Sequence, residues 1–188
     1  MKKNGSSKKE TFKSFFLPLI VLVVICAVIG SAMAAINLIT APKIEETQAK
    51  KKQEALSAVV PDNQGFEKLS ISNLPERVTE VYADKGSASL ALMLSVKGYD
   101  SSKPMSVAVG FDENGEIIKI SVISCSGETQ GIGSKVSGEE FLTQFLGKSD
   151  ASAVDTVSGA TISSGAFIDG INDACRVVKE YRATEVTK

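Results

Sequence analysis

The apolar residues of this chain are concentrated near its beginning. From Phe15 to Ile39 the sequence has no charged residue, whereas charged residues are frequent on both sides of this run. About 20 apolar residues in a helix are enough to cross the hydrocarbon core of a bilayer. The pattern therefore predicts a single transmembrane helix over residues 15–39, preceded by a short basic tail over residues 1–14.

The basic tail predicts the orientation of this helix. Residues 1–14 contain five lysines and one glutamate, and such positive flanks remain on the cytoplasmic side of a membrane. We therefore expect a cytoplasmic N-terminus and an extracytoplasmic remainder of the chain. A cleaved signal peptide is the alternative, because Ser31–Ala35 is rich in small residues. The apolar part of a signal peptide is usually shorter, so we favour a retained anchor.

A charged segment after the apolar run reads as a helix that ends before Pro61. Its sparse apolar side consists of Ile44, Leu56 and Val59. The residues that follow are rich in proline, glycine and asparagine, which indicates loops with short elements. We expect a stalk helix and loops over residues 40–78 and a folded domain over residues 79–188.

Three segments of the folded domain read as β-strands. Leu90–Val96 is short, apolar and flanked by glycines, and Met105–Phe111 alternates apolar with small residues. The Asn-Gly pair at residues 114–115 suits a tight turn, because both residue types tolerate positive φ. Ile117–Ile123 then returns as the partner strand. The spacing predicts an antiparallel hairpin.

A short helix is expected after these strands. Ser137 and Glu140 have the spacing of a capping box, which predicts that Ser137 caps this helix. Phe141 and Phe145 would share one face, and Gly147 would close the last turn.

The last predicted helix spans Ser164–Arg182. Apolar residues at helical spacing give it one stripe, which consists of Phe167, Ile171, Ala174, Cys175 and Val178. Together with the strands, these helices predict an α+β fold, in which helices flank an antiparallel sheet.

Composition narrows the chemistry that is possible. The net charge is -1 and the chain has no histidine. The charge argues against a nucleic-acid partner, and the lack of histidine excludes serine–histidine catalysis and histidine-based zinc sites. Cys26, Cys125 and Cys175 do not have the spacing of a metal site, so no metal is expected. Cys125 and Cys175 read as two small buried residues, with a disulfide between them as the alternative.

Two loops with glycines stand out. Residues 128–133 read ETQGIG between a strand and a helix, and residues 155–161 read DTVSGAT at a helix entrance. Glycines let the backbone approach a ligand closely, and a helix N-terminus favours an anion such as phosphate. There is a plainer interpretation of each loop. The glycines of the first loop only allow the backbone to turn, and Thr161, Ser163 or Ser164 of the second loop only caps the helix.

These motifs resemble those of the FMN-binding G subunit of Rnf electron-transport complexes. The sequence is also similar to the C subunit of the sodium-translocating NADH:quinone oxidoreductase, which shares the flavin-binding domain. Asp155–Thr161 matches the family pattern D-x-x-S/T-G-A-T. Ser126–Gly133 matches the family block H-x-E-T-P-G-L-G, with Ser126 in place of the common His and Gln130 in place of the Pro. The resemblance covers nearly the whole chain, including its single anchor.

The resemblance implies a covalent flavin. In the family the last threonine of the first pattern, here Thr161, holds FMN through a phosphoester bond made by a separate flavin transferase. Asp155 is expected to help the transferase to recognise this segment. The other residues expected around the cofactor are Ser158, Gly159, Ala160, Glu128, Thr129, Gly131, Ile132 and Lys135. Tyr99 is either a stacking partner for the flavin ring or a core tyrosine.

The implied function is that of an electron carrier on the outer side of the cell membrane. It would work with other membrane subunits of an Rnf-type complex that couples electron transfer to ion translocation, and it would not be an enzyme with a substrate of its own. The alternatives are the flavin subunit of a related quinone-reducing complex, a stand-alone flavin shuttle, and an anchored extracytoplasmic binding module without flavin.

Overall fold

The structure is a computed structural model that describes residues 6–186. The chain divides into two compact units, Met1–Ala49 and Lys50–Lys188. Residues 1–5 of the predicted basic tail lie outside the described residues, and so do the side chains of residues 6–15. The side of the membrane on which the tail lies therefore stays a prediction from the sequence.

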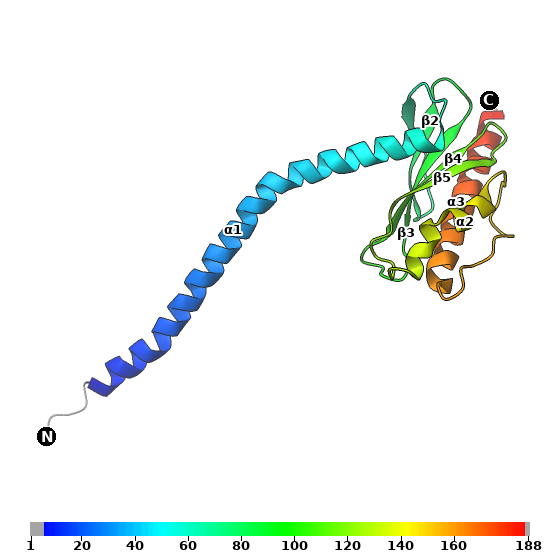
Figure 1. Cartoon of the computed structure of the whole chain (residues 1–188). Coiled ribbons are helices and arrows are strands. Elements are labelled where there is room, and N and C mark those ends of the chain that lie inside the picture. Colours follow the sequence, from blue (N-terminus) through cyan, green and yellow to red (C-terminus); the bar gives the residue numbers. More distant parts are fainter. Residues whose placement is uncertain (1–5, 187–188) are drawn as a thin grey trace. The chain divides into compact units, whose positions relative to one another are not determined.

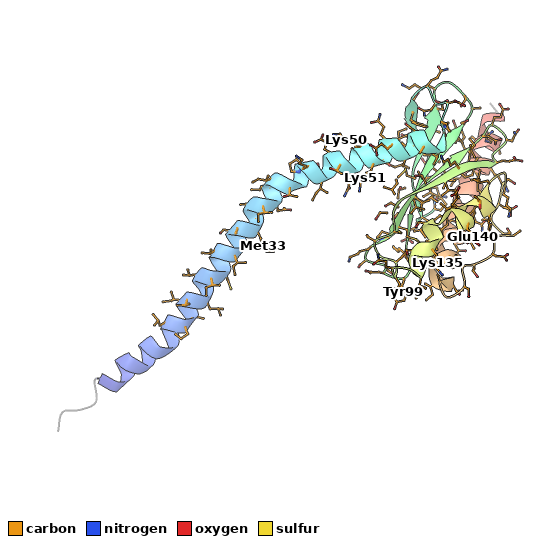
Figure 2. The ribbon with its side chains drawn as sticks, in the orientation of Figure 1. Met33, Lys50, Lys51, Tyr99, Lys135 and Glu140 are labelled. Carbon is orange, nitrogen blue, oxygen red and sulfur yellow. The ribbon has the colours of Figure 1, made fainter. Side chains whose placement is uncertain are left out.

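One helix, α1, spans Ser6–Val59 (Figure 1). The predicted transmembrane and stalk helices are thus one continuous element, even though Pro18 and Pro42 lie inside it and each lacks a backbone N–H donor. The helix is long and apolar enough to cross a membrane. The large apolar side chains of its apolar stretch are exposed, as Met33 shows (Figure 2). The Ser31 hydroxyl donates to the Ala27 carbonyl at 2.7 Å, so this polar group has a partner within the apolar stretch.

Five antiparallel strands form one sheet in the order β1-β2-β3-β4-β5 (Figure 1). They are β1 (Phe66–Leu69), β2 (Val78–Asp84), β3 (Leu90–Val96), β4 (Met105–Phe111) and β5 (Ile117–Ser124). Each strand therefore pairs with its neighbours in the sequence. The strands predicted at residues 90–96 and 105–111 are confirmed with their bounds, whereas β1 lies in the segment expected to hold loops and short elements.

The predicted hairpin joins β4 to β5. Phe111 faces Ile117 across the turn, and Gly115 adopts a φ of 82°, which a side chain would disfavour. One carboxylate oxygen of Asp112 accepts hydrogen bonds from the backbone N–H groups of Asn114 and Glu116 at 2.9 and 2.8 Å. The turn is therefore held by the aspartate as well as by the Asn-Gly pair.

The last helix, α3, spans Thr161–Val186 and packs on the sheet. Every residue of its predicted apolar stripe is buried. The main core joins Phe167, Ile171 and the rest of this stripe to alternate residues of the strands, among them Leu92, Leu94 and Phe111. A second, smaller core joins the end of α1 to the strands and includes Leu56, Val59, Ala91, Met93 and Ala108. Successive residues of β3 enter different cores, because side chains alternate across a strand.

The segment between β5 and α3 folds into short helical turns. These are η1 (Gly133–Ser137), α2 (Glu139–Leu142) and η2 (Thr143–Phe145). Phe141 and Phe145 are buried with ring centroids 5.2 Å apart, as their shared face predicts. The predicted capping box is wrong, because Gly138 holds the cap position of α2. Ser137 already belongs to η1, and its hydroxyl donates to the Ser134 carbonyl at 2.7 Å.

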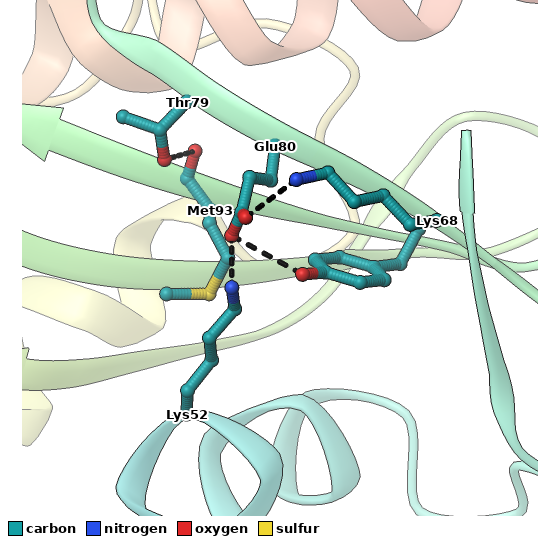
Figure 3. Close-up of polar contacts among 6 residues, drawn as sticks. Lys52, Lys68, Thr79, Glu80 and Met93 are labelled. Atoms are coloured by element: carbon teal, nitrogen blue, oxygen red, sulfur yellow. Dashed lines mark hydrogen bonds and ion pairs between the residues drawn. The ribbon is translucent and has the colours of Figure 1, made fainter. Parts of the chain in front are cut away.

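An ion pair also connects the end of α1 to the sheet (Figure 3). The Glu80 carboxylate accepts from Lys68 at 2.8 Å, from the Tyr82 hydroxyl at 3.1 Å, and from Lys52 of α1. Partial burial opposes ionisation of Glu80, but these hydrogen bonds and the lysine charges outweigh it and lower the pKa of Glu80 to about 2. The last turns of α1 are therefore an integral part of the unit that contains the sheet.

Candidate functional site

A cavity of about 410 Å³ lies where three parts of the folded unit meet. These parts are the connection from β3 to β4, the 128–133 loop, and the entrance of α3. The sequence-predicted residues that line the cavity are Thr129, Ile132, Gly159, Ala160 and Thr161. Both loops singled out by their glycines therefore contribute to one cavity.

Thr161 is the first residue of α3 and is exposed at this cavity. The turn before it depends on Gly159, whose φ is 79°. The Ala160 N–H donates to the Val157 carbonyl at 2.9 Å, which closes the turn. Ala160 is buried, so the chain is held in place immediately before Thr161. The sequence Gly-Ala-Thr thus presents a hydroxyl to solvent from a fixed backbone.

The entrance of α3 lies three residues before its predicted start. The Ala160 carbonyl accepts the first helical hydrogen bond, from the Ser164 N–H at 2.9 Å, so Ala160 occupies the cap position. The interpretation that Thr161, Ser163 or Ser164 caps the helix is therefore wrong. The Ser164 hydroxyl instead donates to the Ala160 carbonyl at 2.9 Å and accepts from the Val157 N–H at 3.2 Å.

Exposed apolar side chains surround the cavity. Tyr99, Ile132 and Ile162 are 67%, 49% and 64% exposed. Of the two interpretations of Tyr99, the core tyrosine is excluded, because the side chain lies at the surface of the domain (Figure 2). Large apolar groups gathered beside a cavity indicate a ligand or partner surface more than scattered ones do.

Glu128 lies behind the cavity wall. Its side chain is buried, with 8% exposed. One carboxylate oxygen accepts from the Tyr99 N–H at 3.1 Å, and the other accepts from the Ser163 hydroxyl. Glu128 therefore connects two residues of the cavity wall that are far apart in the sequence.

The remaining predicted residues do not line this cavity. Lys135 and Ser158 line a second cavity of about 600 Å³ together with Gln144. The Asp155 N–H donates to the Gln144 side chain at 3.1 Å. Gly131, with a φ of 79°, forms a turn in which its N–H donates to the Ser134 hydroxyl at 2.9 Å. In the described part of the chain, no group of three or more Cys, Asp or Glu residues is arranged to hold a metal ion.

Sequence reasoning missed three residues of the first cavity, namely Gly133, Ile162 and Ser163. Gly133 is visible in the sequence as the last glycine of the first loop. Ile162 also carries a signal, since an isoleucine directly after a hydroxyl-rich turn falls outside the apolar stripe of α3. The role of Ser163 depends on its distant partner Glu128, so no local pattern could reveal it.

Residues 98–176 match the FMN-binding domain family, and this range contains both loops and the first turn of α3. The family match therefore identifies an FMN-binding domain, which follows the candidate membrane-spanning helix in the sequence. Three proteins are similar to the chain over most of its length. The G subunit of the Na⁺-translocating ferredoxin:NAD⁺ oxidoreductase complex of Acetobacterium woodii is 29% identical, covering 84% of this chain and 88% of that protein.

The second is the G subunit of the proton-translocating ferredoxin:NAD⁺ oxidoreductase complex of Clostridium ljungdahlii, which is 27% identical over 85% of this chain and 89% of its own length. The third, the G subunit of the ion-translocating oxidoreductase complex of Methanosarcina acetivorans, is 25% identical over 83% of this chain and 90% of its own length. The chain is therefore similar to the G subunits of Rnf-type complexes over most of its length, and it contains an FMN-binding domain. With its candidate spanning helix, it is a membrane-anchored protein.

Proposed function

We propose that this chain is an electron-transfer protein that carries FMN on Thr161 through a phosphoester bond. The observation that carries the proposal is the position of Thr161, exposed at the first residue of α3 and beside a cavity of about 410 Å³. FMN, when attached, supplies reversible redox chemistry that the side chains of this protein could provide only by forming a disulfide. The protein contributes the position and the electrostatic environment of the cofactor.

The residues at the cavity fit the two chemically different ends of FMN. Tyr99, Ile132 and Ile162 offer apolar surface suited to a flat ring, and the cavity volume lies within the range of cofactor sites. The first turn of α3 offers backbone N–H groups without helical acceptors and the positive end of the helix dipole, both of which favour a phosphate. Thr129 and Ala160 complete the contact surface.

The attachment step would exchange one phosphorus–oxygen bond for another. The Thr161 oxygen bonds to the FMN phosphorus of FAD, the pyrophosphate bond breaks, and AMP leaves. None of the residues that line the cavity carries a carboxylate or an amine, so the hydroxyl proton would pass to a flavin transferase. Asp155 and Ser158 are exposed shortly before Thr161, which suits a segment that a transferase must recognise.

The partners would be other membrane subunits of an Rnf-type complex that couples electron transfer to ion translocation. The names of the three similar proteins support this choice over a quinone-reducing complex or a stand-alone shuttle.

The five lysines of the basic tail support an extracytoplasmic flavin domain. Alkaline phosphatase fused after Lys188 would be active in that orientation and inactive in the opposite one.

The covalent link can be tested on denaturing gels under ultraviolet light. The full chain, Thr161→Ala and Thr156→Ala would each be co-expressed with a flavin transferase. Thr156 is the matched control, because it is an exposed threonine of the same segment. A fluorescent band in the wild type and in Thr156→Ala, but not in Thr161→Ala, supports the proposal. A band that persists in Thr161→Ala, or no band in the wild type while a control substrate is modified, contradicts it.

A further inference from the structure

The buried carboxylate of Glu128 is surrounded by groups that donate hydrogen bonds to it. Both of its oxygens accept hydrogen bonds, one from the Tyr99 N–H and one from the Ser163 hydroxyl. Each oxygen therefore has one hydrogen-bond donor from the protein. Among the ion pairs of the described residues, none includes Glu128. Its charge is therefore held by hydrogen bonds to the protein and not by a lysine or arginine.

Two glycines make room for this carboxylate. A Cβ on Gly98 would lie 1.9 Å from one oxygen of Glu128, and a Cβ on Gly133 would lie 2.9 Å from the other. With a side chain at either position, the carboxylate of Glu128 would have to move. The observed position of the carboxylate therefore depends on the absence of a side chain at both glycines.

The position of Ser163 gives the carboxylate an electrostatic role. Ser163 is the third residue of α3, so its hydroxyl brings Glu128 to the N-terminal turn of the helix. A negative charge is favourable there. The cavity wall in front of Glu128 is formed by Tyr99, Gly133 and Ser163, all of which lie against the carboxylate.

We propose that Glu128 is a positioning residue for the flavin site. It fixes the Tyr99 and Ser163 parts of the cavity wall to each other, and it keeps a negative charge behind that wall. The part of the proposal that concerns the flavin rests on the proposed function. A fixed negative charge near a flavin opposes the addition of electrons, so Glu128 lowers the reduction potential of a bound flavin.

Glu128→Gln separates charge from shape, because glutamine retains the size and one acceptor oxygen. In the full chain in detergent, the Tyr99 amide is expected to exchange with deuterium about fivefold faster or more, since a bond to a charged acceptor is replaced by a weaker neutral one. In the flavin-loaded protein the reduction potential is expected to move in the positive direction. Glu113→Gln, which changes an exposed glutamate in the β4–β5 turn, is the matched control and should change neither quantity.

The two measurements fail in different ways. If the wild type takes up no flavin, the proposed function fails, whereas exchange at Tyr99 in the unloaded protein still decides whether Glu128 fixes the wall. Glu128→Gln with unchanged Tyr99 exchange would overturn the positioning role. Faster exchange together with an unchanged flavin potential would overturn the charge effect and leave Glu128 with a structural role alone.

Discussion

Gly110 of β4 lies directly against the backbone of Val59 at the end of α1. A Cβ added to Gly110 would come within 2.2 Å of the Val59 carbonyl oxygen and 3.1 Å of the Val59 Cβ. The end of α1 can therefore pack on the sheet only because this position has no side chain. The contact explains why the smaller core contains residues from a helix that otherwise has an exposed apolar surface.

Gly110→Ala should destabilise the folded unit. The added methyl group would push α1 away from β4, and overpacking of this kind costs about 1–3 kcal/mol. Chemical denaturation of the full chain in detergent would measure the loss. Gly165→Ala is the matched control, because Gly165 lies in α3 with nothing within 4 Å of an added Cβ. It should be neutral or stabilising, since alanine favours a helix. Equal losses for the two variants would contradict the prediction.

Glu80 should make stability depend on pH in the acid range. Its pKa in the folded chain is about 2, below the ordinary value of 4.5. The ionised form therefore stabilises the fold above the unfolded pKa, and this contribution, at most about 3 kcal/mol, disappears as the pH falls from about 4.5 towards 2. Unfolding free energies measured from pH 7 to pH 2 should decline less steeply in Glu80→Gln.

Glu67→Gln is the control for this experiment, because Glu67 is an exposed glutamate on the neighbouring strand β1. Its pH profile should follow that of the wild type. If Glu80→Gln and the wild type have the same profile, the contacts of Glu80 with Lys52, Lys68 and Tyr82 (Figure 3) do not stabilise the ionised carboxylate.

Cys175 should resist thiol reagents in the folded chain. It is buried on the inner face of α3, and burial raises the pKa of its thiol to about 11, so little thiolate forms at neutral pH. Cys125 is partly exposed, and both residues are free thiols. Maleimide labelling followed by mass analysis should therefore modify Cys125 before Cys175. Equal labelling is expected only after denaturation, and equal labelling of the native chain would contradict the prediction.

Ile162→Ala should alter the flavin environment without preventing attachment. The substitution removes part of the exposed apolar surface beside Thr161 and leaves the hydroxyl in place. We expect a fluorescent band of normal intensity on denaturing gels, together with a visible spectrum of the native protein closer to that of free FMN. Ile118→Ala, on the exposed side of β5, is the control. A spectrum that changes equally in both variants would speak against Ile162 as part of the flavin surface.

The fold can be predicted from the sequence wherever one local pattern decides it. The β4–β5 hairpin is predictable because strand alternation and the Asn-Gly turn agree, and the stripe of α3 is predictable because its apolar residues keep a helical period. The predicted start of α3 is three residues late, since the hydroxyls at its entrance look like caps. In the structure, however, Ser164 bonds back to Ala160 and Ser163 turns to Glu128.

The candidate site can be predicted only in part, for a physical reason. The loops around Gly133 and Thr161 are recognisable by their residue types, whereas the contact between Glu128 and the Tyr99 N–H joins segments 29 residues apart. Neither segment has a repeating pattern of residues from which this contact could be predicted. Lys135 and Ser158 are expected at the same cavity because Lys135 is near the first loop in sequence and Ser158 is near Thr161. In the structure, both residues line the second cavity instead.

The neighbour-to-neighbour order of the five strands has a consequence for how the domain folds. Each strand can pair with the one synthesised before it, so most of the sheet can form through short loops, and topologies of this kind fold comparatively fast. The main core still lacks α3 at that stage, and α3 is the last element of the chain. Because Thr161 is the first residue of α3, we expect its position to be fixed only once α3 packs on the sheet, and a flavin to be attached to a completed domain and not to a nascent one.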